Sequence, residues 1–162
     1  MPGAMARQLP GEELEIVVSQ WDREPLGDVY DIGVKLERRG VEGLALKVFE
    51  YVIFRYDPVP SDHPYDRVMG SDIYTRIGRL SLMREDYESA SSALMKAIKL
   101  NPGDMEPRFY VGELLLAKGR VDAAMACFFR VASRTSDIDL ANRSLERINQ
   151  IFYHETEVDC VN

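Results

Sequence analysis

The sequence predicts an all-α helical solenoid built from short antiparallel helix pairs. From Gly27 to about His154, apolar residues recur at three- and four-residue intervals, the spacing of one face of an α-helix. No segment alternates apolar and polar residues as a half-buried strand does. The helical pattern is interrupted at Arg39-Gly40 and at residues 57–64, 84–86, 101–104, 118–120 and 135–137. These breaks divide the chain into helices that are short enough to pack in pairs.

A period of 34 residues relates two of the predicted helix pairs. It carries Gly78, Ala90 and Leu94 onto Gly112, Ala124 and Phe128, whereas a backward shift of 45 residues gives Gly33, Ala45 and Phe49. The longer shift corresponds to one period plus an 11-residue insertion. A small residue in each helix of a pair allows close backbone approach, and the larger residue then fills the space toward the next unit. The sequence therefore predicts three copies of one unit.

This pattern resembles the tetratricopeptide repeat, a helix-turn-helix unit with small and aromatic residues at set offsets. The resemblance implies repeats at about residues 26–59, 71–104 and 105–138. Stacked repeats need caps with a polar outer face. We expect Glu12 to Trp21 to form an N-terminal capping helix and residues 138–154 to form a C-terminal one, with Ile138, Leu140, Ala141, Leu145, Ile148 and Ile151 as its apolar residues. Residues 11–155 are then one domain, between a mobile tail at 1–10 and a polar tail at 156–162.

The insertion between the first two repeats contains three prolines, which an uninterrupted helix does not accommodate. We expect a loop from Asp57 to Asp62. The following helix is predicted to begin at Pro64, because proline suits a first helical turn.

Composition and charge exclude several functions for this 162-residue chain. Its net charge is -7, and no basic stripe is present that could bind nucleic acid or a membrane surface. The most apolar stretch, Val48 to Phe54, is too short to cross a bilayer, and the N-terminus lacks the apolar core of a signal peptide. We therefore expect a cytoplasmic protein whose Cys127 and Cys160 are reduced thiols.

The sequence offers little that could perform catalysis. His63 and His154 lie far apart, and no Cys or His has the spacing of zinc ligands. Neither a glycine-rich phosphate loop nor a nucleophile turn is present. We predict a protein that is not an enzyme and that uses no metal and no cofactor.

Tetratricopeptide arrays bind peptides on a concave surface lined by the first helix of each repeat. In this sequence the inferred peptide-binding residues are Tyr30, Val34, Arg79, Leu82, Phe109, Glu113 and Leu116. Apolar, aromatic and charged side chains together suit an extended or helical client segment with apolar anchors of its own. An alternative remains open, in which Tyr30, Phe109 and Leu116 only cover neighbouring helices.

A more specific resemblance lies in the third repeat, which opens with Glu106-Pro107-Arg108-Phe109 and continues with Leu114-Leu115-Leu116-Ala117-Lys118-Gly119. With the overall architecture, this segment resembles class II chaperones of bacterial type III secretion, which hold translocator proteins. The resemblance implies passive, ATP-independent binding of a partly unfolded apolar client in the cytoplasm. The alternatives are a generic scaffold that joins folded proteins and, more remotely, a regulatory subunit of an enzyme. A homodimer is possible, and the sequence does not identify the client.

Overall fold

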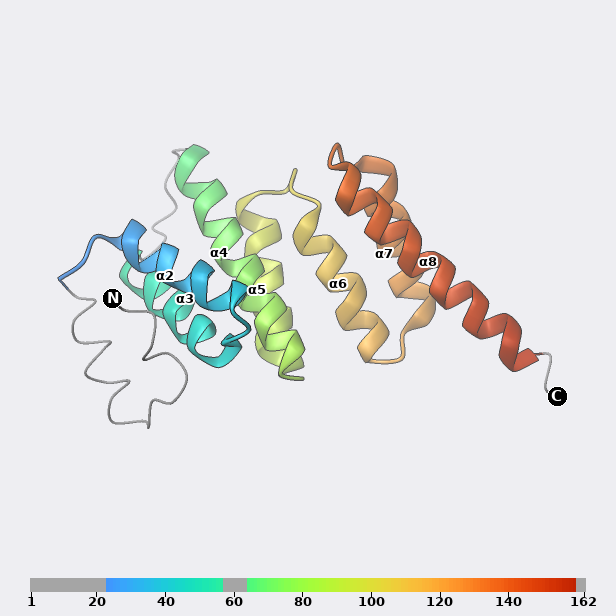
Figure 1. Ribbon diagram of the computed structural model, residues 1–162. Coiled ribbons are helices and arrows are strands. Elements are labelled where there is room, and N and C mark those ends of the chain that lie inside the picture. Colours follow the sequence, from blue (N-terminus) through green and yellow to red (C-terminus); the bar gives the residue numbers. More distant parts are fainter. Residues whose placement is uncertain (1–22, 57–63, 160–162) are drawn as a thin grey trace. The chain divides into compact units, whose positions relative to one another are not determined.

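The computed structural model describes residues 23–56 and 64–159, which contain seven α-helices and no strand (Figure 1). Contacts divide the chain into two compact units, Met1–Val59 and Pro60–Asn162. The first contains α2 (Leu26–Arg38) and α3 (Glu42–Tyr56). The second contains α4 (Pro64–Met83), α5 (Tyr87–Leu100), α6 (Glu106–Ala117), α7 (Val121–Arg134) and α8 (Ile138–Asp159). The all-α prediction is confirmed for these residues.

Other sequence predictions remain open. The predicted tail at residues 1–10, the helix from Glu12 to Trp21 and the loop from Asp57 to Asp62 lie outside the described residues. The count of three repeats and the single domain at residues 11–155 stay predictions.

Each helix pair is held together by the same contact between a glycine and a large side chain. A Cβ atom added to Gly33 would lie 2.8 Å from a ring atom of Phe49, and one added to Gly112 would lie 2.7 Å from Phe128. At Gly78 the corresponding distance to Leu94 is 2.6 Å. Ala45, Ala90 and Ala124 are fully buried. The residues that the period places in equivalent positions therefore make equivalent contacts within the pairs α2–α3, α4–α5 and α6–α7.

The turn inside each pair repeats as well. Gly40, Glu85 and Gly119 occupy the left-handed backbone region, with φ angles of 72°, 61° and 70°. In all three turns the N–H of this residue donates to the carbonyl three residues earlier, and the next N–H donates to the carbonyl five residues earlier. These bonds satisfy carbonyls that the end of the first helix leaves unpaired. Glutamate thus occupies a position that the other two turns give to glycine.

The helix starts follow from local chemistry. Helix α4 begins at Pro64, as predicted. The Asp86 carboxylate accepts a hydrogen bond from the Ser89 N–H at the start of α5, and Asp137 accepts from the N–H groups of Asp139 and Leu140 at the start of α8. Helix α8 extends to Asp159, beyond the predicted end at residue 154, because no Gly or Pro follows that could stop it.

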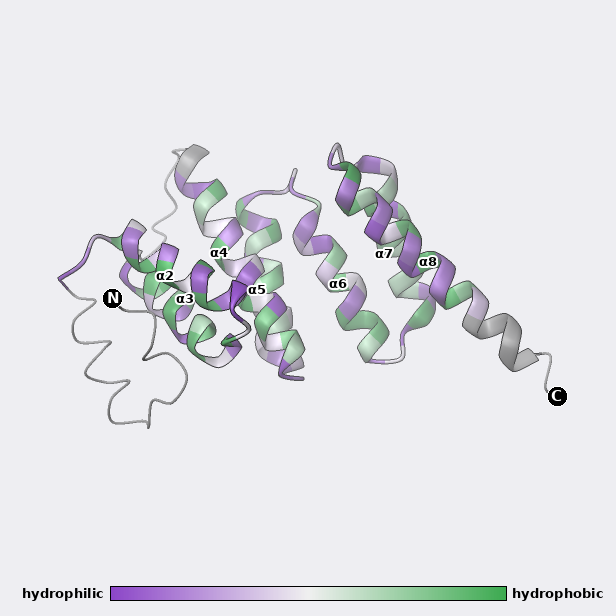
Figure 2. Ribbon diagram, in the orientation of Figure 1, coloured by the Kyte–Doolittle hydropathy of each residue, from purple (hydrophilic) through white to green (hydrophobic). Residues whose placement is uncertain are grey.

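The core of the second unit continues into α8. Leu140, Ile148 and Ile151 join a buried cluster that includes Phe128 and Val131 of α7. The predicted apolar face of α8 is wrong at two positions, because Ile138 is 75% exposed and Leu145 is 48% exposed. Both lie on the side of α8 away from the helices it packs against. In Figure 2 each of these helices carries both hydrophobic and hydrophilic residues, as expected for helices packed on one side.

We expect Gly112→Leu to destabilise the second unit by about 1–3 kcal/mol, because the new side chain must displace the fully buried Phe128 ring. Urea unfolding followed by circular dichroism measures the change. Gly103→Leu is the matched control, since Gly103 is exposed and a Cβ there meets only ordinary contacts. Equal stabilities of the two variants would contradict the close helix contact.

Glu85→Gly is expected to stabilise the protein by about 1 kcal/mol, because glycine adopts the left-handed conformation without steric cost. Glu85→Ala is the control. It removes the same charge but keeps the strain, so its urea midpoint should stay near that of the wild type. A gain of equal size in both variants would attribute the effect to charge rather than to backbone conformation.

Candidate binding site

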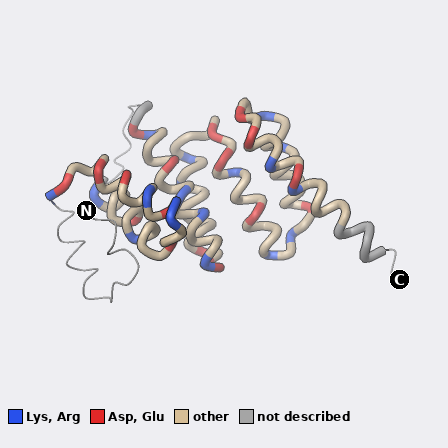
Figure 3. Tube along the Cα trace, in the orientation of Figure 1, with Lys and Arg blue, Asp and Glu red and all other residues tan. Residues whose placement is uncertain are grey.

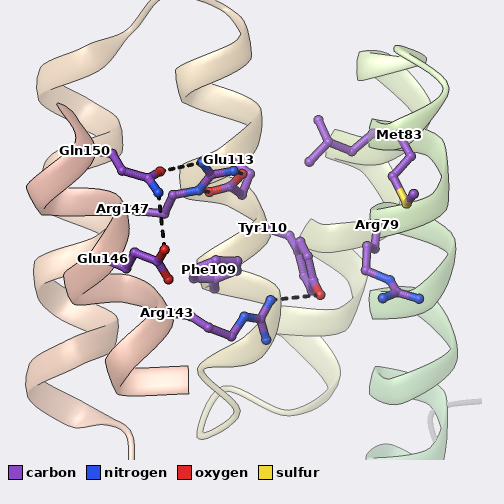
Figure 4. A pocket seen from close by; sticks show the side chains of 10 residues that line it. Arg79, Met83, Phe109, Tyr110, Glu113, Arg143, Glu146, Arg147 and Gln150 are labelled. Carbon is purple, nitrogen blue, oxygen red and sulfur yellow. Dashed lines mark hydrogen bonds and ion pairs between the residues drawn. The ribbon is translucent and has the colours of Figure 1, made fainter. Parts of the chain in front are cut away.

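The second unit contains a pocket of about 500 Å³ between α4, α6 and α8 (Figure 4). Helix α6 contacts both α4 and α8, so side chains from all three reach the same space. The lining residues are Arg79, Leu82 and Met83 from α4; Phe109, Tyr110 and Glu113 from α6; and Arg143, Glu146, Arg147 and Gln150 from α8.

Two aromatic rings of α6 form the floor of the pocket. Phe109 and Tyr110 meet edge to face with their ring centroids 5.4 Å apart, and Phe109 lies 5.5 Å from the Phe128 ring. Phe109 is only 5% exposed. Its ring packs against Phe128 on one side and is covered by Arg143 of α8 on the other. A direct contact of Phe109 with a client stays a prediction.

Arg143 is the side chain of α8 that covers these rings. Its guanidinium carbon lies 4.4 Å from the centroid of Phe109 and 5.8 Å from that of Tyr110. Arg143 Nη2 also donates a hydrogen bond of 3.3 Å to the Tyr110 hydroxyl. A guanidinium stacked on aromatic faces is attracted by their quadrupoles. The contact attaches α8 to the floor and places a positive charge at the pocket wall.

An ion pair joins α6 to α8 along the same wall. Arg147 donates from Nε to Glu113 Oε1 at 2.7 Å and from Nη2 to Glu113 Oε2, which makes the pair bidentate. Arg147 Nη1 donates to Gln150 at 2.8 Å. Because bidentate geometry fixes both side chains, Glu113 and Arg147 form a rigid polar edge.

The opposite wall is more apolar. Met83 is 54% exposed, and Leu82 beside it is half-buried. Arg79 lies on the same helix and also lines the pocket, on the side of Tyr110 away from Phe109 (Figure 4). Figure 3 shows acidic and basic residues interspersed along the chain from α4 to α8, and the pocket lining itself contains three arginines and two glutamates.

The sequence-predicted site residues fall into three groups. Arg79, Leu82, Phe109 and Glu113 line the pocket together. Leu116 does not line it and packs half-buried against the core cluster. The remaining two, Tyr30 and Val34, are half-buried on α2 in the first unit, where the Tyr30 ring lies 5.8 Å from Phe49. A binding surface that includes Tyr30 and Val34 stays a prediction.

Sequence reasoning missed the contribution of α8, which was assigned only a capping role. Arg143, Arg147 and Gln150 follow Phe109, Glu113 and Leu116 by 34 residues each. One further step of the repeat period therefore identifies three of the lining residues. Helix α8 occupies the place of the first helix of another repeat.

Glu106 lies at the start of α6, near the pocket. Burial raises the pKa of its carboxyl group, and Asp104 and Asp72 raise it further, whereas Arg143 and Arg76 lower it. Asp72 and Arg76 are themselves paired at 3.0 Å on α4. The folded state therefore binds a proton at Glu106 more readily than the unfolded state does.

The described residues contain no group of three or more His, Cys, Asp or Glu side chains that could hold a metal ion. No described helix is long and apolar enough to span a membrane. Burial raises the pKa of the Cys127 thiol on α7, partly offset by Arg130, so the fold favours the protonated thiol over the thiolate.

The raised pKa of Glu106 predicts a pH-dependent effect of Glu106→Gln. The wild type loses stability as pH rises from the ordinary glutamate pKa through the raised folded value, because the folded state must release a proton it favours. We expect the glutamine variant to be more stable at pH 7, and this gain to vanish below the ordinary pKa. Urea unfolding of both proteins, from pH 7 to below the ordinary glutamate pKa, measures this difference in stability. Glu88→Gln, at an exposed position, is the control. A gain that persists unchanged in acid would contradict the assignment.

No protein-family model matches the sequence, and no curated protein sequence matches it. Solved structures do match. PcrH from Pseudomonas aeruginosa aligns with 20% identity and a TM-score of 0.62 over 92% of this chain and 98% of its own. The Yersinia enterocolitica type III secretion chaperone SycD, solved with a peptide of the translocator YopD, aligns with 18% identity and a TM-score of 0.63 over 80% and 94%.

MamA also aligns, with 14% identity and a TM-score of 0.59 over 90% of this chain and 86% of its own. At these identities the similarities establish the fold. The chain has the tetratricopeptide-like helical architecture of the type III secretion chaperones that its third repeat resembles in sequence.

Proposed function

We propose that this protein is a non-catalytic chaperone that holds an apolar segment of a partly unfolded client protein in the pocket between α4, α6 and α8. The observation that carries the proposal is the pocket itself. It combines a rigid aromatic floor, an exposed apolar rim at Met83 and fixed charges at Arg143, Glu113 and Arg147.

The pocket suits a peptide better than a small reactant. Its wall is open toward solvent at Met83, and its polar groups are already engaged with one another rather than arranged around a reacting atom. Apolar side chains of a client would contact Leu82, Met83 and the Tyr110 ring. The charged edge would then orient the polar backbone of the client, which is the usual division between anchors and rim in peptide recognition.

The comparisons support a client of this kind. SycD has been solved with a peptide of the translocator YopD, and PcrH with the chaperone binding region of PopD. By analogy, we propose that the client here is a translocator of a type III secretion system and that binding takes place in the cytoplasm. A homodimer of the chaperone is compatible with this role.

A generic scaffold that joins folded proteins is the competing function. Purification of the tagged protein from its native host, followed by limited proteolysis of whatever co-purifies, distinguishes the two. A chaperone protects one segment of a client that is otherwise cleaved throughout. A folded partner that resists the protease both alone and in the complex would favour the scaffold.

Met83→Glu is expected to weaken client binding by at least about 1 kcal/mol, because it replaces an apolar contact at the rim with a charge that binding must desolvate. Calorimetry with the client segment measures the loss. Met95→Glu on α5 is the matched control, since Met95 is also an exposed methionine, at 59%, and lies outside the pocket.

Both methionine variants should unfold at the same urea concentration as the wild type, because both side chains are exposed. If Met95→Glu weakened binding as much as Met83→Glu, the pocket would not be the client site.

A further inference from the structure

The outer face of α8 carries an apolar stripe that no described part of the chain covers. Ile138, Leu145 and Phe152 are spaced by seven residues, and they are 75%, 48% and 57% exposed. A seven-residue spacing places them on one line along the helix. This line lies on a different side of α8 from the buried residues Leu140, Ile148 and Ile151.

The 34-residue period shows which position of the preceding repeat corresponds to the stripe on α8. Leu145 follows Val111 of α6 by 34 residues. Val111 is half-buried and lines a small cavity with Ile98 of α5 on one side and with Ala126 and Cys127 of α7 on the other. Helix α8 has no second helix after it among the described residues. Leu145 is therefore exposed at a position where the preceding repeat places another helix.

The residues beside the stripe indicate what kind of helix fits. Asn142 and Asn149 are exposed and alternate with Leu145 and Phe152 at intervals of three and four residues. A helix–helix seam normally has apolar residues at both core positions, and an asparagine at one of them fixes the register at a cost in stability. This face therefore suits a helix that places apolar residues against the stripe and polar groups against Asn142 and Asn149.

Charge on the flank of the stripe narrows the choice of partner. Asp139 and Glu146 are exposed and seven residues apart, so they lie on one line beside the stripe, and Glu146 also lines the pocket. Glu146 occupies the position of Gly112, where a repeat requires close approach. The Glu146 carboxylate accepts a hydrogen bond of 3.4 Å from the neutral amide of Gln150. A helix that docks here must therefore supply a cation opposite Glu146 or leave its charge unneutralised and partly desolvated.

We propose that the outer face of α8 binds an amphipathic helix of a partner protein, one that presents an apolar ridge flanked by Lys or Arg. A second copy of this chain fits poorly, because antiparallel pairing of two α8 helices would bring Asp139 and Glu146 of both copies together. The predicted N-terminal helix fits poorly for the same reason, since it carries Glu12, Glu13 and Glu15.

Two synthetic helical peptides of about 20 residues test the proposal, both with the same leucine ridge but one with lysine and the other with glutamate flanks. Calorimetry should detect binding of the lysine peptide to the full chain, and at least about tenfold weaker binding of the glutamate peptide. The double variant Leu145→Ser/Phe152→Ser should lose binding of the lysine peptide. Phe129→Ser, which removes an exposed aromatic side chain on α7, should bind it like the wild type.

The double variant Asp139→Asn/Glu146→Gln should reduce the preference for lysine over glutamate flanks while keeping the apolar contact. The proposal is overturned if neither peptide binds, or if Phe129→Ser weakens binding as much as Leu145→Ser/Phe152→Ser. It is also overturned if ultracentrifugation shows a wild-type dimer that Leu145→Ser/Phe152→Ser abolishes, since the face would then belong to a second copy. Client binding at the pocket is measured separately, so failure of one site does not decide the other.

Discussion

The contact between a glycine on the first helix of a pair and a large side chain on the second is the constraint on which the structure depends. At Gly112 the Phe128 ring occupies the volume that any Cβ atom would need, and the same holds for Gly33 with Phe49. Close approach fixes the distance between the two helices of a pair, and in the pair α6–α7 it also holds the Phe128 ring against a second residue of α6. Phe128, held against Gly112, supports the ring of Phe109 from below.

The binding pocket inherits its geometry from this packing. Phe128 packs against Phe109 and so supports the aromatic floor on which Arg143 stacks. The ion pair between Glu113 and Arg147 joins two residues that are 34 positions apart, which is one repeat period. Residues one period apart occupy equivalent positions on α6 and α8, and this places their side chains within reach of each other.

How much of this can be read from the sequence depends on what each pattern encodes. The spacing of Gly78 and Gly112 reports a local steric requirement, so it identified the helix pairs, and Pro64 marked the start of α4 for a similar reason. Phe109 shows the limit. Its position indicates which face of α6 it occupies, but its burial depends on Arg143 from another helix, which periodicity within α6 does not contain.

The exposed stripe on α8 could not be predicted from the sequence either, because exposure also depends on which other helices lie nearby. An apolar residue at helical spacing predicts burial only if another element covers that face, and Leu145 meets no such element. One residue in the sequence does indicate that this face of α8 differs from α6. Glu146 stands where the preceding repeat has Gly112. A carboxylate there prevents a further helix from packing as closely as α7 packs on α6. A helix that packs beside α8 must therefore neutralise this charge, which is the property that we propose for the partner of the stripe.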